Sequence, residues 1–340
     1  MIRIDGSKGE GGGQILRTSV SLATALGKPV EIYNIRANRN NPGLRPQHLS
    51  SIRTIAEISQ SETQGLSLNS TTINILPNKV LSKNMYVDIG TAGSITLLMQ
   101  SVIQAISLCG KKFQFSVRGG TDVNWSPSAD YFRRLVVPVL ETLGFSISMS
   151  IIKRGFFPKG NGQIDFEIQS PKKLNNINLI NPKYENVTID GIFTSDKNHF
   201  INQCEQAQQF LKNHNISVDS INSSSCTSSS FGSAICISYS SPSCFIASDI
   251  VGNKNIPKNE LGISCAKKFL FEYNSKCTID HHLADMIIPL LSISKEPSVF
   301  LTSFISNHLK TNLEISKLLT GMSYKIDKQN KFCYSIIINP

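Results

Sequence analysis

The chain has 340 residues, of which 40% are hydrophobic and 17% are charged, a composition typical of a globular protein with a sizeable core. No apolar run approaches a membrane span and the N-terminus lacks the pattern of a signal peptide, so we expect a cytosolic protein, or a nuclear one in a eukaryote. The net charge of +10 suits a polyanionic partner such as nucleic acid or a nucleotide, although a basic solvated surface explains it equally well.

A glycine-rich stretch, GSKGEGGGQILR at residues 6–17, leads into a predicted helix at 15–26. It contains neither a Walker A loop nor the dinucleotide-binding glycine pattern. Such a stretch commonly brings backbone close to a phosphate, and a tight turn is the alternative. A carboxylate beside phosphates is repulsive unless a divalent cation lies between them. Glu10 is therefore a candidate ligand for Mg²⁺ or Mn²⁺.

An internal repeat follows, because residues 14–37 align with residues 96–119 at a constant offset of 82. Each copy predicts a buried helix, a stop marked by glycine and a strand with alternating apolar residues. A second helix is predicted after each strand, at 47–59 and 129–144. Such units must stack to bury their apolar faces.

A basic loop, IRANRNNPGLRPQH at residues 35–48, joins the first predicted strand to the second helix. It carries Arg36, Arg39, Arg45, Gln47 and His48. Arginine suits bidentate contact with phosphate, and a helix start favours an anion site. A solvated loop is the alternative.

The middle of the chain is serine-rich at 217–248, with strands predicted at 234–240 and 244–251 and helices at 196–213 and 257–273. We interpret residues 182–275 as an α/β domain inserted into a core made of residues 1–181 and 276–340. The repeat pattern resumes with a helix at 281–293, a strand at 298–304 and a helix at 311–319. His308 falls between these last two elements, a setting that suits a nucleophile or an acid–base group, although a lone histidine is more often structural. The eight cysteines show no zinc-binding spacing and are interpreted as free, mostly buried thiols.

Several motifs, each weak alone, occur together in one order: GEGGGQILR, IRANRNNPGLRPQH, GTAGS, GGTD, RGFFPKGNG, HLADMIIP and NHLKTNLE. In this order they resemble the RNA 3′-terminal phosphate cyclases, over essentially the whole chain. The resemblance implies an α/β fold of repeated units, each with helices on a four-stranded sheet, plus a smaller inserted α/β domain. It also implies ATP-dependent conversion of an RNA 3′-phosphate end into a 2′,3′-cyclic phosphate, with release of AMP and pyrophosphate.

The resemblance further implies roles for individual residues. His308 matches the nucleophile that becomes adenylylated, and Glu10 matches the metal-binding carboxylate. The residues that match the nucleotide site are Arg17, Arg39 and Gln47 for the phosphates, and Gln100, Pro127, His282, Leu283, Ala284, Asp285 and Met286 for adenosine. Asp285 is the expected polar contact to the base, and His282 stands where relatives often have a tyrosine that stacks on adenine. We expect Arg36 and Arg45 to hold the RNA backbone.

Two other functions remain open. The family has a branch of cyclase-like ribosome-assembly proteins in eukaryotes that lack the catalytic histidine, so His308, Glu10 and the pair of Arg17 and Arg39 favour the enzyme. The enolpyruvyl transferases use a similar stacked architecture, but the lone His308 and the basic charge argue against that chemistry. The sequence leaves the RNA substrate open, and also whether the chain forms a homodimer.

Overall fold

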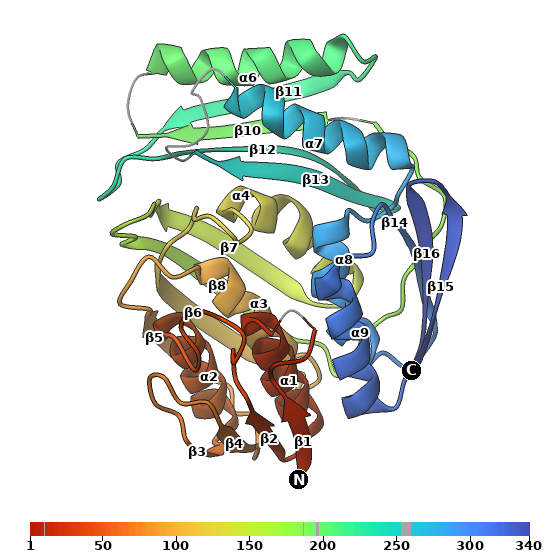
Figure 1. Cartoon of the computed structure of the whole chain (residues 1–340). Coiled ribbons are helices and arrows are strands. Elements are labelled where there is room, and N and C mark those ends of the chain that lie inside the picture. Colours follow the sequence, from red (N-terminus) through yellow and green to blue (C-terminus); the bar gives the residue numbers. More distant parts are fainter. Residues whose placement is uncertain (10, 186, 195–196, 253–259) are drawn as a thin grey trace.

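The computed structural model of the chain describes residues 1–9, 11–185, 187–194, 197–252 and 260–340. Its strands form sheets of four strands each (Figure 1). Three of these sheets repeat one strand order and share a hydrophobic core with their helices. The fourth sheet and its helices have a core of their own. The expected α/β fold of helices on repeated four-stranded sheets is confirmed.

The first unit comprises β1 (Ile2–Asp5), α1 (Gly13–Leu26), β2 (Val30–Tyr33), α2 (Pro46–Ser59), β3 (Glu62–Gln64) and β4 (Ile73–Leu76). The strand order is β1-β2-β4-β3, with β1 and β2 parallel and the other neighbours antiparallel. In β2, Val30 and Ile32 are fully buried while the residues between them are partly exposed, as expected of a strand with one face on the core. Helix α1 ends at Gly27, which adopts a left-handed conformation with φ of 63°.

The second unit comprises β5 (Asn84–Asp88), α3 (Ile95–Ala105), β6 (Lys112–Gly119), α4 (Ala129–Tyr131), the π-helical turn η1 (Phe132–Val136), α5 (Val137–Thr142), β7 (Ser146–Lys153) and β8 (Gly162–Gln169). Its strand order, β5-β6-β8-β7, matches that of the first unit. The starts of β5, α3 and β6 at positions 84, 95 and 112 each lie 82 residues after those of β1, α1 and β2 at 2, 13 and 30. The predicted repeat is therefore a structural one.

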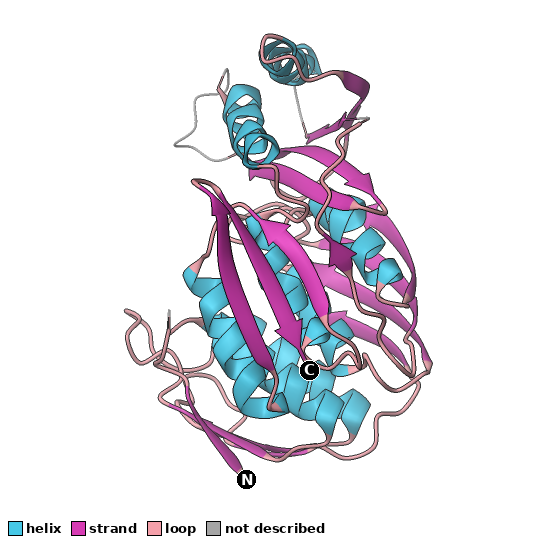
Figure 2. Ribbon diagram, turned by 90° about the vertical axis from the view of Figure 1, so that its right-hand side faces the viewer, coloured by secondary structure: helices cyan, strands magenta, loops and turns pink. Residues whose placement is uncertain are grey.

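The third unit begins before the inserted segment and is completed after it. It comprises β9 (Asn178–Leu179), α8 (His281–Leu291), β14 (Ser298–Thr302), α9 (Asn307–Thr320), β15 (Ser323–Asn330) and β16 (Cys333–Asn339). The sheet order β9-β14-β16-β15 is the same once more. Figure 2 shows the hairpin of β15 and β16 from the front, beside the C-terminus. The repeat is thus threefold. The third copy contains the helix, strand and helix with which the sequence predicts that the pattern resumes, and it adds β9, β15 and β16.

The fourth sheet is formed by β10 (Val187–Phe193), β11 (Val218–Ser225), β12 (Ser233–Ser241) and β13 (Cys244–Val251), in the order β11-β10-β12-β13. Helices α6 (Lys197–Lys212) and α7 (Leu261–Ser275) cover one face, and α4 and η1 lie against the other (Figure 1). On that second face, Arg134 of η1 donates two hydrogen bonds of 2.7 Å to the carboxylate of Asp190 on β10. The division into a core and an inserted domain at 182–275 stays a prediction.

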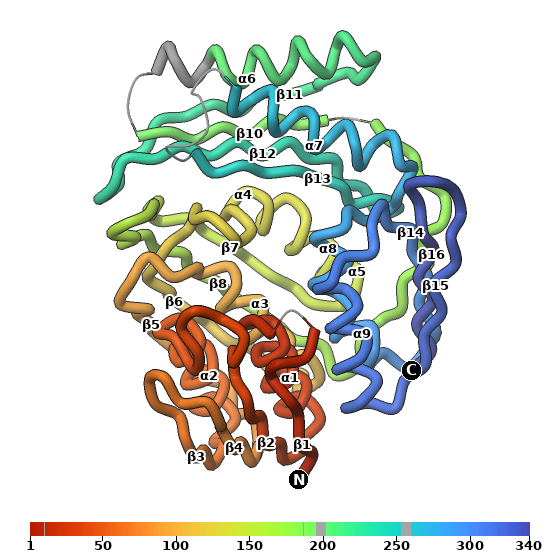
Figure 3. The backbone as a smooth tube through the Cα atoms, in the orientation of Figure 1, coloured from red at the N-terminus to blue at the C-terminus, as the bar shows by residue number. Residues whose placement is uncertain are grey.

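Helices α1, α3, α8 and α9 pack against one another between the three repeated units, and Figure 3 shows the backbone of α9 beside that of α1. Within the described part of the chain, no helix combines the length and apolar character needed to cross a membrane. All eight cysteines are free, and six of them are buried, as the sequence predicts.

Candidate functional site

The glycine-rich stretch lies at the start of α1 and brings basic side chains close to the backbone. A Cβ atom at Gly13 would lie 2.3 Å from Nε2 of His48 and 3.0 Å from an Nη atom of Arg17. A Cβ atom at Gly12 would lie 3.1 Å from Nη2 of Arg39. Glycine is therefore needed for this close approach, and the N-cap residue Gly12 supplies no side-chain hydrogen bond to the first N–H groups of α1. Those N–H groups and the neighbouring cations form an arrangement suited to an anion.

The same stretch also contacts α9. A Cβ atom at Gly9 would lie 2.2 Å from Oγ1 of Thr311, three residues after His308. The glycine-rich stretch therefore lies between the predicted phosphate-binding arginines and the predicted nucleophile. Glu10, the predicted metal ligand, lies outside the described residues.

His308 lies in the first turn of α9 and not in a loop before it. The sequence predicts a helix start at 311, whereas α9 starts at Asn307. The reason is Ser306, whose Oγ caps the helix by accepting a hydrogen bond of 2.8 Å from the backbone N–H of Leu309. The serine before His308 was the sequence signal for this earlier start. The correction makes His308 part of a fixed helix terminus.

Hydrogen bonds join the starts of α8 and α9 to α1. Oγ of Ser306 donates to a carboxylate oxygen of Asp285 over 2.6 Å. Asn312 is fully buried, donates to the backbone carbonyl of Asp285, and accepts a hydrogen bond of 2.8 Å from Thr18. Because Thr18 follows Arg17, this network fixes Arg17, Asp285 and the first turn of α9 relative to one another.

The five residues 282–286 lie in the first turns of α8, where their side chains differ in exposure. The side chain of His282 is exposed, and its ring lies 3.9 Å from that of His281. Leu283 and Ala284 are fully buried in the core. The backbone carbonyl of Met286 accepts a hydrogen bond of 3.0 Å from Gln104 of α3. The side chains of this stretch that reach the surface are therefore those of His282 and, in part, Met286, whereas Asp285 is buried.

Three further predicted residues lie on or beside α2 and α3. Gln47 is in the first turn of α2, where its Cβ atom would be 3.4 Å from a Cβ placed at Gly93. Gln100 lies on α3, one turn before the Gln104 that contacts α8. The backbone carbonyl of Pro127 accepts a hydrogen bond of 2.8 Å from Thr96 at the start of α3. Helix α3 thus connects the residues predicted to bind phosphate to those of the predicted adenosine pocket.

Two arginines of the basic loop, Arg36 and Arg45, donate hydrogen bonds to uncharged oxygen atoms. An Nη atom of Arg45 donates to Asn69 over 2.9 Å, and an Nη atom of Arg36 donates to the backbone carbonyl of Asn41 over 3.3 Å. Burial, together with the positive charges of Arg45 and Arg39, lowers the pKa of Arg36. The arginines therefore repel one another, and an anion among them would relieve that repulsion.

Burial also acts on the basic groups beside the glycines. It lowers the pKa of Arg17 to about 10, which leaves the guanidinium charged at neutral pH. Burial and the charges of Arg17, Arg36 and Arg45 lower the pKa of His48 to about 3, so its imidazole is neutral. Nδ1 of His48 accepts a hydrogen bond of 3.2 Å from the backbone N–H of Arg45. The proton of this neutral ring is therefore on Nε2, the atom that faces Gly13.

Sequence analysis included His48 in the basic loop expected to bind an anion but gave it no individual role. Its signal is its position as the third residue of α2, where its side chain and that of Arg45 form a reciprocal capping arrangement. That signal indicates a helix start but not the contact with Gly13, which depends on the packing of α2 against α1.

Partial loss of hydration beside neighbouring protein atoms lowers the pKa of His282. The nearby charges of His281, Lys268 and His308 lower it further. Because the His282 side chain is exposed, water screens part of this effect. His281 behaves in the opposite way. Its Nδ1 lies 2.5 Å from a carboxylate oxygen of buried Glu272 on α7. Burial alone would lower the pKa of His281, but the hydrogen bond and charge of Glu272, together with the charges of Asp280 and Asp285, raise it.

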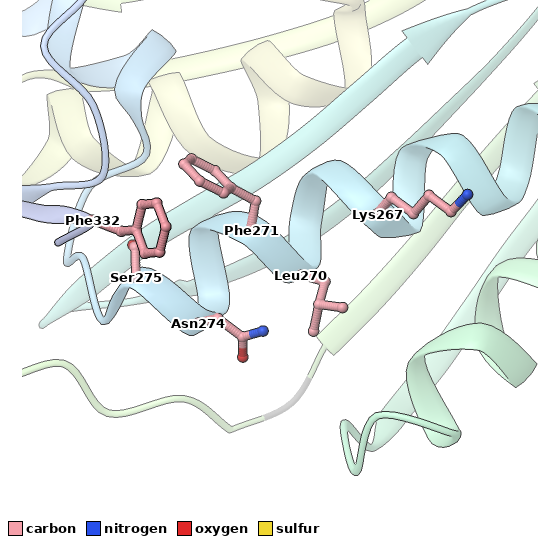
Figure 4. A pocket seen from close by; sticks show the side chains of 6 residues that line it. All are labelled: Lys267, Leu270, Phe271, Asn274, Ser275 and Phe332. Carbon is pink, nitrogen blue, oxygen red and sulfur yellow. The ribbon is translucent and has the colours of Figure 1, made fainter.

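Two shallow cavities lie away from these residues. One, of 310 Å³, lies between α7 and the turn joining β15 to β16 (Figure 4); its lining residues are Lys267, Leu270, Phe271, Asn274, Ser275 and Phe332. The other, of 430 Å³, is a polar groove over β5, β6, β7 and β8. Neither is lined by a residue predicted for the site.

Comparison with known proteins gives a consistent result. A family model described as RNA 3′-terminal phosphate cyclase matches residues 8–326. The RNA 3′-terminal phosphate cyclase of Pyrococcus abyssi is 35% identical over 331 residues, which cover 96% of this chain and 95% of the relative. The protein of the same name from Methanosarcina barkeri is 33% identical over 330 residues, 97% of each chain. That from Pyrobaculum aerophilum is 35% identical over 324 residues, 92% of this chain and 91% of the relative.

Proposed function

Because the chain belongs to the RNA 3′-terminal phosphate cyclase family, we propose that it converts RNA 3′-phosphate ends to 2′,3′-cyclic phosphates at the expense of ATP. The observation that best supports this is the grouping of Arg17, Arg39 and His48 around Gly12 and Gly13, with α9 packed against Gly9. This arrangement suits a triphosphate held between a helix start and a nucleophile.

The reaction needs activation because an RNA 3′-phosphate is a poor electrophile toward its own 2′-hydroxyl. Direct cyclisation would expel oxide or hydroxide. Transfer of AMP to the phosphate creates a phosphoanhydride, from which AMP leaves readily. Two nucleotidyl transfers before ring closure therefore account for the consumption of ATP.

We propose His308 as the first nucleophile, because imidazole is nucleophilic near neutral pH and forms a labile phosphoramidate. An imidazole nitrogen attacks the α-phosphorus of ATP, so that an N–P bond forms and pyrophosphate leaves. A 3′-phosphate oxygen of the RNA then attacks that phosphorus and releases the imidazole. Finally the 2′-oxygen attacks the terminal RNA phosphorus, AMP leaves, and the hydroxyl proton is released to solvent. Ring closure benefits from the proximity of both groups on one ribose.

The groups around α1 would bind the phosphates of ATP. Arg17 and Arg39 supply charge, while Gln47 and the first N–H groups of α1 supply further hydrogen bonds. Neutral His48 would add an uncharged donor through Nε2. Glu10 would hold Mg²⁺ or Mn²⁺, which neutralises charge on the departing pyrophosphate.

The start of α8 would bind adenosine. The exposed ring of His282 offers a surface on which adenine can stack, and Pro127 offers an apolar contact. Asp285 would accept a hydrogen bond from the base, and Gln100 and Met286 would border the pocket. Fully buried Leu283 and Ala284 would act through their backbone. Arg36 and Arg45 would contact the RNA backbone.

The test is incubation with α-labelled ATP and Mg²⁺, followed by a denaturing gel. The wild-type protein should acquire an acid-labile, alkali-stable label, and His308→Ala should abolish it, because no other imidazole can replace a nucleophile fixed in the first turn of α9. His214→Ala is the matched control, because His214 is exposed and lies after α6, outside the site. Label retained in His308→Ala would assign the nucleophile to another residue.

A second readout separates the cyclase from a cyclase-like assembly factor. An RNA with a 3′-phosphate end should yield a cyclic phosphate, and one with a 2′-deoxy terminal sugar should stop at the adenylylated end. Mass analysis distinguishes these products. Protein that carries AMP but forms no cyclic phosphate would contradict the cyclase proposal, and absence of both would favour the assembly factor.

A further inference from the structure

Three large aromatic side chains are largely exposed on connecting segments of the second and fourth sheets. Trp125 is 100% exposed, Phe231 83% and Phe157 71%. They lie in segments 121–127 before α4, 154–161 between β7 and β8, and 226–232 between β11 and β12. Trp125 also has a φ of 67°, an unfavourable conformation for a bulky residue. Exposure of three such rings indicates a surface that binds something.

The three segments meet around one buried residue, Phe156. It forms β-bridges with Asp122 in the first segment and with Gly160 in its own. A Cβ atom at Gly232 would lie 2.2 Å from the ring of Phe156, so the third segment packs directly on it. The backbone N–H of Lys159 donates to Oγ of Ser230 over 3.1 Å. We call Trp125, Phe157 and Phe231 together the aromatic surface.

The charge around the aromatic surface is positive. Lys153 and Lys159 are exposed, and neither forms an ion pair with a described carboxylate. Segments 154–161 and 226–232 contain no acidic residue. Of the acidic groups nearby, Asp122 and Asp130 are buried and bound to Arg154 at 3.1 Å and 2.8 Å. Asp249 accepts a hydrogen bond of 2.7 Å from the backbone N–H of Ser128, and Asp88 is paired with Arg118 at 3.7 Å. The accessible charges therefore complement a polyanion.

The aromatic surface adjoins the candidate site. A Cβ atom at Gly160 would lie 2.8 Å from Cα of Ala92, and the next residue, Gly93, packs against Gln47. Trp125 is two residues from Pro127 of the predicted adenosine pocket. In Figure 1 the connections between β7 and β8 and between β11 and β12 lie together at the left side. A chain leaving the phosphate-binding residues could thus continue over these rings.

We propose that the aromatic surface binds the nucleotides that precede the 3′ end of a single-stranded RNA. Bases would stack on the rings of Phe157, Phe231 and Trp125, while Lys153 and Lys159 would contact phosphates. Stacking tolerates any base, because every base has a π-face. The aromatic surface would therefore raise the affinity for longer RNA without selecting a sequence. The proposal rests on the proposed function, since it takes the RNA 3′-phosphate to react at His308, beside the phosphates of ATP held by Arg17 and Arg39.

The test uses an RNA of about ten nucleotides with a 3′-phosphate and a fluorescent 5′ end, within the length range of single-strand binding sites. Fluorescence anisotropy should show that Phe157→Ala and Phe231→Ala each raise Kd about tenfold, equivalent to about 1.4 kcal/mol and within the range for one stacked base. Phe157→Trp should restore affinity. Phe271→Ala and Phe332→Ala are matched controls, because these half-exposed rings line the remote cavity of Figure 4. Their Kd should equal that of the wild type.

A kinetic comparison separates this proposal from the proposed function. The ratio of kcat/KM for the longer RNA to kcat/KM for a dinucleotide 3′-phosphate should fall about tenfold in Phe231→Ala. Unchanged Kd and an unchanged ratio in both alanine variants would overturn the aromatic surface as an RNA site, and a protein partner would then be the better explanation of the exposed rings. Wild-type protein that binds RNA through these rings but forms no cyclic product would instead contradict the proposed function.

Discussion

Two histidines lie at helix starts on either side of the glycine-rich stretch, His48 on α2 and His308 on α9. His48 is 7% exposed, and its two ring nitrogens face the N–H of Arg45 and the backbone at Gly13. Surrounded by three arginines, it cannot take up a proton near neutral pH. The environment therefore makes His48 a fixed hydrogen-bond donor at Nε2.

This leads to a prediction on pH and stability. The pKa of His48 is about 3 in the folded chain against 6.5 ordinarily, so between these values the unfolded chain binds more protons. Stability from His48 is therefore complete above about pH 6.5 and is lost as the pH falls, by on the order of 3 kcal/mol down to about pH 4. In His48→Gln this contribution should disappear, which urea unfolding across that range would measure.

The pH dependence of the free energy of unfolding must be compared between His48→Gln and the wild type, because other groups also titrate in this range. Burial and the charge of Glu272 raise the pKa of Asp280, whose contribution therefore changes in the opposite direction, with stability falling as the pH rises above about 4. His214→Gln, at an exposed position, should reproduce the wild-type profile. An identical pH profile in His48→Gln would show that His48 titrates normally in the folded chain.

At the scale of elements, the candidate site is formed where the N-termini of several helices lie close together. Helices α1, α2, α3, α8 and α9 present their first turns to it, and only some of them are capped by a side chain. Ser94, Asp280 and Ser306 cap α3, α8 and α9, whereas Gly12 leaves α1 open. The start of α1, whose N-cap Gly12 has no side chain, lies among the arginines, as does the start of α2 at Arg45.

The junction of α1, α8 and α9 supports a prediction on Asn312. Asn312→Ala leaves the buried hydroxyl of Thr18 and the backbone carbonyl of Asp285 without this partner. We expect a loss of about 1–3 kcal/mol in the free energy of unfolding, because buried polar groups lose their hydrogen bonds. Chemical denaturation measures it, and Lys310→Ala, exposed on the same helix, should change it little. A loss in Asn312→Ala no larger than in Lys310→Ala would mean that the junction does not stabilise the fold.

At the scale of the whole molecule, Asp280 connects three parts of the chain. It is fully buried and accepts hydrogen bonds from the hydroxyl of Tyr131 on α4 at 2.7 Å and from the N–H of Ala247 on β13 at 3.0 Å. It also caps α8 through the N–H groups of His282 and Leu283. One carboxylate thus joins the second unit, the fourth sheet and the helix that bears the predicted adenosine pocket.

Tyr131→Phe tests this connection. The variant removes one donor to a buried carboxylate, and we expect it to lower the free energy of unfolding by about 1–3 kcal/mol. The hydrogen bond from Tyr131 lowers the pKa of Asp280, so its loss raises that pKa further. The deficit relative to wild type should therefore be larger at about pH 8, where the carboxylate is charged, than at about pH 5.

The control for Tyr131→Phe is Tyr86→Phe, because the Tyr86 side chain is 62% exposed. Thermal or urea unfolding at both pH values gives the comparison. Equal deficits at both values would contradict the assignment of the loss to the Asp280 carboxylate.

The sequence by itself determined the repeated units, because helix and strand periodicity is local and the spacing of 82 residues recurs in the chain. It also indicated the glycine-rich stretch and the basic loop as anion-binding elements, since glycine and arginine have these properties wherever they occur. It also predicted that the repeat pattern resumes after the inserted segment with a helix, a strand and a helix. It missed β9, which lies about a hundred residues before α8, and it began α9 four residues late.

Only the tertiary structure decided which of these residues act together. The contacts of Gly13 with His48 and of Gly9 with Thr311 join segments far apart in the chain, and they depend on how α1 packs on α2 and α9. Burial of Leu283 and Ala284 beside exposed His282 depends on which face of α8 meets the core. The same holds for the aromatic surface, whose rings lie on three segments held together by Phe156. A sequence pattern indicates whether each segment prefers to form a helix, a strand or a turn. The distances between segments are set by the packing that buries all their apolar faces together.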